Sequence, residues 1–169
     1  NWWGNQTLIH AGLMSSNLYQ IFPIDIHLEY LRISPYAFTH RIPWNNYTNY
    51  SYPLGTDVEP NSDLIFSKIN YRLSNDINLS VEYKFMRHGA NPLYPDGTLK
   101  ENVGGNRLIG HRPYDSEETV FLAGEREYSS EIALSAILEP FNNIFVMIKG
   151  ISRNESKQSG VNKRHNEIF

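Results

Sequence analysis

The stretch Ile77-Asn78-Leu79-Ser80-Val81-Glu82-Tyr83-Lys84-Phe85 decides the fold class of this chain. Its odd-numbered residues are apolar and its even-numbered residues are polar. Successive side chains of a β-strand point to opposite faces of the sheet, so this alternation predicts a strand with one apolar face and one wet face. The length of the stretch is also close to that with which a tilted strand crosses a bilayer.

The same alternation recurs elsewhere in the chain. Residues 24–30, 65–73 and 127–138 each place most of their apolar side chains at every second position. Residues 144–151 are apolar on both faces, and residues 7–14 are a weaker candidate. No long segment has a helical period, and a short helix starting at Asp115 or Ser116 is the most that we expect. The sequence therefore predicts an all-β fold, an antiparallel up-and-down meander of about six strands.

The connections between these strands fall into two classes. Residues 74–76 and 139–143 are expected to form short turns, whereas about 34–63 and about 86–126 form long segments rich in Gly, Pro, Asn and Tyr. Loops of this length are unusual in a compact soluble domain. Short turns at one rim and long loops at the other are typical of outer-membrane barrels. We therefore predict a sector of an outer-membrane β-barrel.

Composition agrees with this prediction without requiring it. The 169 residues have a net charge of -3, so nothing favours nucleic acid as a partner, and the absence of cysteine excludes disulfides and thiolate chemistry. About six strands are too few for a closed membrane barrel. The polar stretch 163–167, just before Phe169, also predicts a poor last strand. We expect residues 1–169 to be a single domain from the C-terminal part of a larger barrel.

Three groups of loop and turn signatures carry a resemblance to a known family. They are Tyr47–Gly55 with Pro60–Leu64 and the strand ending at Leu73; Tyr83–Gly89 with Asn102–Gly105; and Phe121–Arg126 with Leu138–Asn143. In this order, and over about residues 1 to 153, the chain resembles the C-terminal half of the Wzi-like capsule assembly family. The resemblance implies an outer-membrane barrel that holds capsular polysaccharide at the bacterial cell surface.

The resemblance also implies the partners. They would be outer-membrane lipid and capsular polysaccharide or lipopolysaccharide, bound without turnover and without a cofactor. No sugar-binding residue of that family is matched here one by one.

Two other functions remain open from the sequence. A soluble carbohydrate-binding β-sandwich also alternates, with its apolar face turned to a second sheet. The environment of the apolar residues between Ile77 and Phe85 distinguishes the two. A phosphohydrolase is the third alternative, because Arg87-His88-Gly89 resembles the Arg-His-Gly of the histidine phosphatases. However, Asn91 replaces the second arginine of that motif, and a turn-rich loop follows instead of a helix.

Candidate binding residues lie in the two long loops, which we expect at the extracellular rim, because binding groups collect on loops held by a rigid scaffold. Flat rings and hydrogen-bonding groups there suit an anionic sugar chain. The candidates are Trp44, Tyr47, Arg87, His88, Tyr94, Asp96, His111, Arg112 and Tyr114. The acidic stretch 57–63 lacks the spacing of a calcium loop, so we assign no metal site. Asp25, His27 and Glu29 share one strand face, which we interpret as the wet face.

Overall fold

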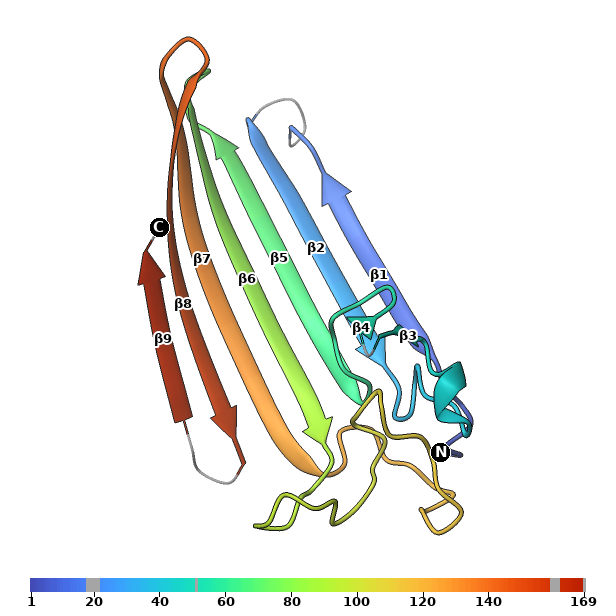
Figure 1. Cartoon of the computed structure of the whole chain (residues 1–169). Coiled ribbons are helices and arrows are strands. Elements are labelled where there is room, and N and C mark those ends of the chain that lie inside the picture. Colours follow the sequence, from blue (N-terminus) through green and yellow to red (C-terminus); the bar gives the residue numbers. More distant parts are fainter. Residues whose placement is uncertain (18–21, 51, 159–161, 169) are drawn as a thin grey trace.

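The computed structural model describes residues 1–17, 22–50, 52–158 and 162–168. They form one antiparallel sheet of seven strands in the order β1-β2-β5-β6-β7-β8-β9, which confirms the predicted meander (Figure 1). The strands are β1 (Leu8–Ser15), β2 (Ile24–Ile33), β5 (Ser62–Arg72), β6 (Ile77–Ala90), β7 (Glu125–Phe141), β8 (Ile144–Lys157) and β9 (Asn162–Ile168). A short 3-10 turn η2 (Pro43–Asn45) and the two-residue strands β3 (Thr48–Asn49) and β4 (Tyr52–Pro53) lie in the loop between β2 and β5. Among the described residues, no helix is long and apolar enough to span a membrane.

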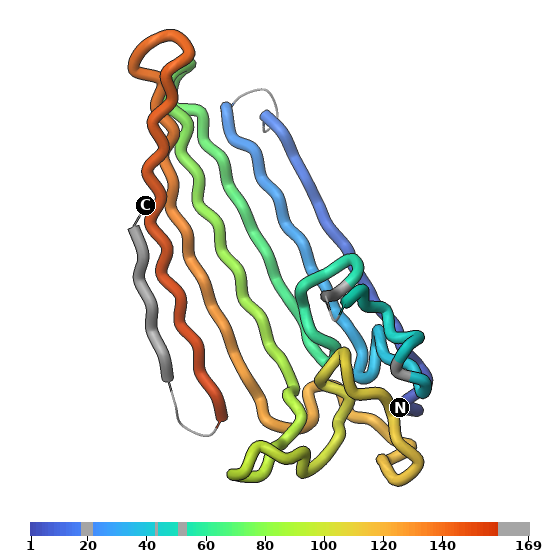
Figure 2. Tube along the Cα trace, viewed as in Figure 1, coloured from blue at the N-terminus to red at the C-terminus, as the bar shows by residue number. Residues whose placement is uncertain are grey.

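The connections separate to opposite ends of the sheet, as predicted. The turns β5–β6 and β7–β8 lie at one end, and the loops 34–61 and 91–124 lie together at the other (Figures 1 and 2). In the β5–β6 turn, Leu73 and Ser74 both donate main-chain hydrogen bonds to the Ile77 carbonyl. The β7–β8 turn is tighter than predicted, because β7 continues through a bulge to Phe141 and the left-handed Asn143 (φ 66°) closes it. We call the two ends of the sheet the turn end and the loop end.

Several strands extend beyond their predicted limits. β6 continues to Ala90, which pairs with Glu125 of β7, so Arg87 and His88 belong to a strand and the prediction that they begin the loop is wrong. β8 likewise continues to Lys157 although its last residues are polar. Main-chain hydrogen bonds hold these strand ends, and they need no apolar side chain.

Two further expectations are corrected near the C-terminus and in the second loop. Polar residues 162–168, expected to make a poor strand, form β9 on the edge of β8, while Phe169 lies outside the described residues. No helix starts at Asp115 or Ser116. Asp115 instead accepts hydrogen bonds from the main chain and side chain of Arg112, so its carboxylate stabilises a turn and does not cap a helix.

One face of the sheet is apolar and uncovered. Ile69, Val81 and Leu134 are neighbours across β5, β6 and β7, and their side chains are 45%, 45% and 57% exposed. The same face carries apolar residues from Ile77 to Phe85 on β6, as predicted, and continues onto β2 and β8 through Leu28 and Ile148. In the described part of the chain no second layer covers this face, so the two-layer sandwich is not observed.

The opposite face carries cross-strand ion pairs. Lys68 Nζ lies 2.8 Å from one carboxylate oxygen of Glu82, and Lys149 Nζ lies 3.9 Å from the other. The Arg153 guanidinium contacts Glu131 at 2.5 Å. These groups belong to β5, β6, β7 and β8, so charge of both signs runs across the width of the sheet. We refer to this side as the polar face.

A small hydrophobic core lies at the loop end of the polar face. Leu31, Ile33 and Ala37 are buried there, with Phe38, Val58 and Leu64 packed against them. Phe38 and Val58 come from the loop 34–61, so this loop folds back over the polar face. The apolar face receives no such cover along its middle.

Candidate binding surface at the loop end

Asn61 joins the two long loops to the sheet. Its side chain is fully buried and donates to the carbonyls of Gly89 (2.8 Å) and Ala123 (3.0 Å), while its Oδ1 accepts from the amide of Leu122 (2.7 Å). Its backbone is left-handed, with φ 58°. Asn tolerates that conformation better than most residues, and its amide can serve donors and acceptors together. Asn61 thereby fixes the end of one loop against the end of the other.

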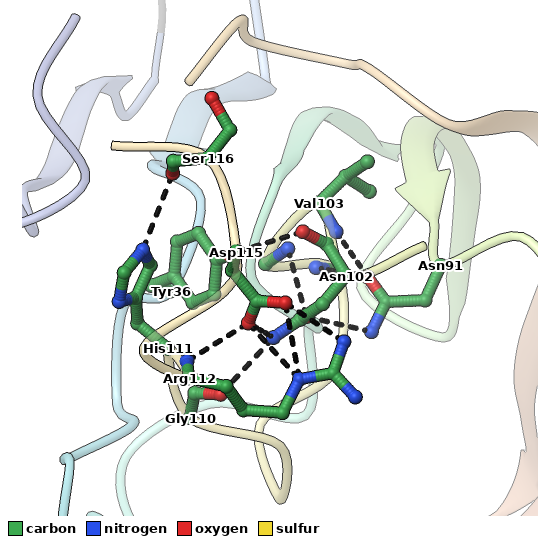
Figure 3. Close-up of polar contacts among 11 residues, drawn as sticks. Tyr36, Asn91, Asn102, Val103, Gly110, His111, Arg112, Asp115 and Ser116 are labelled. Atoms are coloured by element: carbon green, nitrogen blue, oxygen red, sulfur yellow. Dashed lines mark hydrogen bonds and ion pairs between the residues drawn. The ribbon is translucent and has the colours of Figure 1, made fainter. Parts of the chain in front are cut away.

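The carboxylate of Asp115 organises the second loop (Figure 3). It accepts from Asn102 Nδ2 (2.6 Å) and from both the amide (2.8 Å) and guanidinium (2.8 Å) of Arg112. The Asp115 side chain is only 3% exposed. Burial opposes its ionisation, but the hydrogen bonds from Arg112 and Asn102 outweigh burial and hold the Asp115 pKa below its ordinary value. The hydrogen bond and charge of Asp115 in turn raise the pKa of Arg112, so the pair stays ionised.

Buried aromatic rings connect this second loop to the first. Tyr36 is 1% exposed, and its hydroxyl donates to the Asn102 carbonyl at 2.7 Å. Burial and the nearby Asp115 charge raise the Tyr36 pKa far above its ordinary value, so the hydroxyl remains a donor. His111 stacks on Trp3 with ring centres 4.2 Å apart and donates from Nε2 to the Ser116 carbonyl. The two loops therefore form one packed cap.

Arg107, in the loop 91–124, binds the loop 34–61 through its side chain. Its guanidinium bonds to Glu59 (2.8 Å) and to the carbonyls of Thr56 (3.3 Å) and Asp57 (2.7 Å). The side chain is 7% exposed. Glu59 and Asp63 of the acidic stretch are thus engaged by arginines, Asp63 by Arg87. Among the described residues, no group of three His, Asp or Glu side chains is placed to hold a metal ion.

Arg87 and His88, predicted as one site, point to opposite faces because they are neighbours on a strand. Arg87 shares the face of the apolar residues and forms a two-point contact with Asp63, at 2.9 and 2.5 Å. His88 lies on the polar side, where Nε2 donates to the Gly105 carbonyl (2.9 Å) and Nδ1 lies 3.3 Å from Glu127. The two side chains cannot bind the same phosphoryl group, because they lie on opposite faces of the sheet. This placement disfavours the phosphohydrolase alternative.

Three more of the predicted residues have structural partners. Asp96 accepts from the amide (2.9 Å) and hydroxyl (2.6 Å) of Thr98 and so closes a tight turn with Tyr94. The hydrogen bond from the Thr98 hydroxyl lowers the Asp96 pKa most, and the bond from the Thr98 amide lowers it further. His111 and Arg112 are engaged in the loop cap described above. The Tyr94 side chain in this turn is 51% exposed.

The remaining predicted residues are exposed rings. Trp44 is 93%, Tyr114 77% and Tyr47 57% exposed. The Arg112 guanidinium lies over the Tyr114 ring, with its Cζ 4.6 Å from the ring centre. Tyr47 stacks on Phe38 and lines a cavity of about 380 Å³ between the first loop and the polar face. Flat rings held next to polar groups are the arrangement that stacks on sugars.

The sides of that cavity differ in chemistry. Tyr47, Phe38 and Leu54 form the loop wall, while His10 and Glu29 of β1 and β2 supply hydrogen-bonding groups from the sheet. His10 Nε2 lies 3.2 Å from the Glu29 carboxylate. On the sheet side, Leu8, Leu31 and Leu64 line the cavity together with these two polar groups, so its floor is mixed.

Sequence reasoning missed the residues that build the cap. Asn61, Asn102, Tyr36 and Arg107 were not singled out as candidates, although each is buried and bonded across the loops. The available signal was local: Pro60-Asn61 and Asn102-Val103-Gly104-Gly105 combine residue types that accept left-handed backbone. Gly104 does so at φ 75°, and its carbonyl accepts from the Tyr36 amide at 2.9 Å.

Comparison with family models, with curated proteins and with solved structures gave no match to this chain. The resemblance to the Wzi-like family therefore stays a prediction from the sequence.

Proposed function

We propose that this chain is a sector of an outer-membrane β-barrel that binds polysaccharide at the bacterial surface without turnover, as in capsule assembly. The observation that carries the proposal is the polarity of the sheet. One face is apolar and uncovered, and the other is crossed by ion pairs. A bilayer outside and water inside are the surroundings that suit such a sheet.

The apolar face has the features of a membrane-facing band. The middle strands β5, β6 and β7 are 11, 14 and 17 residues long, which is enough to cross a bilayer at a tilt. Tyr71 lies near the turn end of this face, and Tyr30 and Tyr128 lie near the loop end. Tyrosines at both limits of an apolar band are typical of membrane interfaces.

The polar face fits the interior of a barrel. The loop 34–61 folds over it, with Phe38 and Val58 packed on the strands. In the described sheet, β1 and β9 each pair with a single neighbour, so their outer edges have unpaired main-chain groups. Such edges are not tolerated in lipid, so in this proposal further strands close the barrel from β1 and β9.

The proposal of a polysaccharide ligand rests on the loop end. Trp44, Tyr47 and Tyr114 are exposed rings on a cap that is rigidly held by Asn61 and Asp115. Rigid loops that present flat rings suit a sugar chain, and the sequence resemblance points to the same class of ligand.

The membrane part of the proposal is tested by placing one charge on either face. Val81→Arg puts a cation in the middle of the apolar band, where arginine costs roughly 2–4 kcal/mol in lipid. Ser80→Arg puts the same charge on the polar face of the same strand. In the full-length barrel that contains this chain, insertion into phospholipid vesicles should fall sharply for V81R and stay near wild type for S80R. Equal insertion of the two variants, or none by the wild type, would refute the barrel.

The ligand part is tested with exposed rings at opposite ends of the sheet. Trp44→Ala and Tyr114→Ala should each lower polysaccharide retained on the cell surface by about five- to tenfold, the effect of losing roughly 1–1.5 kcal/mol of stacking. Phe141→Ala removes a 71% exposed ring at the turn end and should leave retention unchanged. Retention that does not respond to the first two changes, with normal protein in the membrane, would remove the loop surface as the binding site.

A further inference from the structure

In strands β1, β2 and β5 to β8, the charges on the apolar face lie at one end. In strands β1, β2 and β5 to β8, the charged residues that alternate onto this face are Arg32, Asp63, Arg87 and Arg126. Arg32, Asp63 and Arg87 are direct neighbours across three strands, and Arg126 follows one row closer to the loops. All four lie at the loop end, just beyond the apolar band. We call this group the basic rim.

The basic rim has more positive than negative charge. Asp63 is bound by Arg87, and its side chain is only 5% exposed. Arg32 and Arg126 form no ion pair with any described residue. Arg32 is exposed and lies over the ring of Phe121, 4.0 Å from its centre. Arg126 is exposed and donates one hydrogen bond to the Leu122 carbonyl at 3.4 Å. The rim thus has three guanidinium groups and one carboxylate, which Arg87 binds.

The surroundings of the rim hold these cations in place. Tyr30 donates to Asp63 at 3.5 Å, and Tyr128 is the cross-strand neighbour of Arg87. Phe121 and Leu122 belong to the segment that Asn61 fixes to the sheet. Arg32 on β2 and Arg126 on β7 are three strand spacings apart, on the order of 14 Å. The rim therefore presents two separated, unneutralised guanidiniums to a ligand on the membrane side.

We infer that the basic rim binds the phosphate groups of a glycolipid in the outer leaflet, a lipid of the lipid A class. The inference rests on the proposed function and specifies its lipid partner. Guanidinium groups bind phosphate by paired hydrogen bonds, and the acyl chains of such a lipid would lie along the apolar face immediately below. A ligand with phosphate groups and acyl chains matches the order of the two surfaces along the strands, the basic rim first and the apolar band below it.

The test uses the full chain in uncharged detergent micelles and measures binding of three probes: lipid A with two phosphates, dephosphorylated lipid A, and sodium phosphate. Arg32→Gln with Arg126→Gln removes the two unpaired cations. Arg87 is kept, because its loss would leave the buried Asp63 unpaired. Arg41→Gln with Lys100→Gln is the matched control, since both are exposed loop cations.

Phosphorylated lipid A should bind the R32Q/R126Q variant about 25-fold more weakly than the wild type, roughly fivefold for each cation at a membrane surface. The control variant should stay within about twofold. Dephosphorylated lipid A should bind wild type and variant alike, and millimolar sodium phosphate should not displace lipid A. Equal affinity of wild type and R32Q/R126Q, equal binding of the two lipids by the wild type, or displacement by phosphate alone would each overturn the inference.

Vesicle insertion of the full-length barrel that contains this chain separates the two proposals. A full-length protein that inserts but does not distinguish the lipids would refute the basic rim as a lipid site and leave the barrel standing. A full-length protein that does not insert would refute the barrel, and the lipid site with it.

Discussion

Replacing Asn61 should release both long loops from the sheet. In Asn61→Ala, the carbonyls of Gly89 and Ala123 lose their shared donor and the amide of Leu122 loses its acceptor. Each buried group left without a partner costs about 1 kcal/mol or somewhat more. Alanine at φ 58° adds about 1 kcal/mol of backbone strain. The expected loss in the free energy of unfolding is about 4 kcal/mol.

Two further variants separate the side chain from the backbone. Asn61→Gly removes the same three hydrogen bonds but tolerates the left-handed conformation, so it should cost about 3 kcal/mol. Asn143→Ala introduces a similar strain (φ 66°) in an exposed turn and should cost only about 1 kcal/mol. The order of destabilisation should therefore be N61A, then N61G, then N143A.

Urea unfolding of the protein in micelles, followed by tryptophan fluorescence, measures these differences. Trp3 is a suitable reporter because it stacks on His111 in the loop cap. With a slope of roughly 2 kcal/mol per molar urea, N61A should lower the midpoint by about 2 M and N143A by about 0.5 M. A midpoint for N61A no lower than that of N143A would show that the three side-chain bonds do not hold the loops.

Two other changes test the same cap. The Asp115 pKa lies below its ordinary value of 3.8, so ionised Asp115 stabilises the cap above about pH 4, and this stabilisation is lost as pH falls through the lower, folded pKa. The protection of residues 100–116 against hydrogen exchange, relative to the intrinsic exchange rate at each pH, should fall over that acidic range, and Asp115→Asn should remove this pH dependence. Arg107→Met should free the loop 34–61 and leave the loop 91–124 in place, because it breaks the side-chain bonds to Glu59, Thr56 and Asp57. Limited proteolysis should then cut within residues 54–59 at least tenfold faster than in the wild type. Equal cleavage of wild type and variant would show that Arg107 does not hold this loop.

The strands and their order could be predicted because apolar and polar residues alternate in the sequence itself. Ile77 to Phe85 has a period of two, and the turn at 74–76 is too short for anything but an antiparallel neighbour. Short turns at both hairpins also place the two long loops at one end. The strand ends could not be predicted in the same way, since the polar residues 152–157 are held by main-chain bonds that leave no mark in hydrophobicity.

The interior of the loop cap was beyond sequence reasoning for a different reason. Its stability depends on contacts between residues far apart in the chain, such as Asn61 with Ala123 and Tyr36 with Asn102. Composition indicated loops with left-handed positions but not which carbonyl each Asn would reach. The motif Arg87-His88-Gly89 predicts one site for Arg87 and His88, because it resembles the Arg-His-Gly of the histidine phosphatases, yet adjacent residues of a strand point to opposite faces.

The sign of the charge at the end of the apolar face supports the proposal that a membrane, and not a protein partner, covers this face. Exposed apolar side chains across β2, β5, β6, β7 and β8 form a patch larger than soluble monomers usually leave uncovered, so something must cover it. A second protein layer would also exclude unpaired charge from its buried middle, so the lack of charge there does not separate the two surroundings. The sign of the charge at the loop end favours a bilayer, because a phosphate-rich membrane surface attracts guanidinium groups. Arg32, Arg87 and Arg126 lie at the limit where the apolar band ends, which is where a membrane surface would meet the sheet.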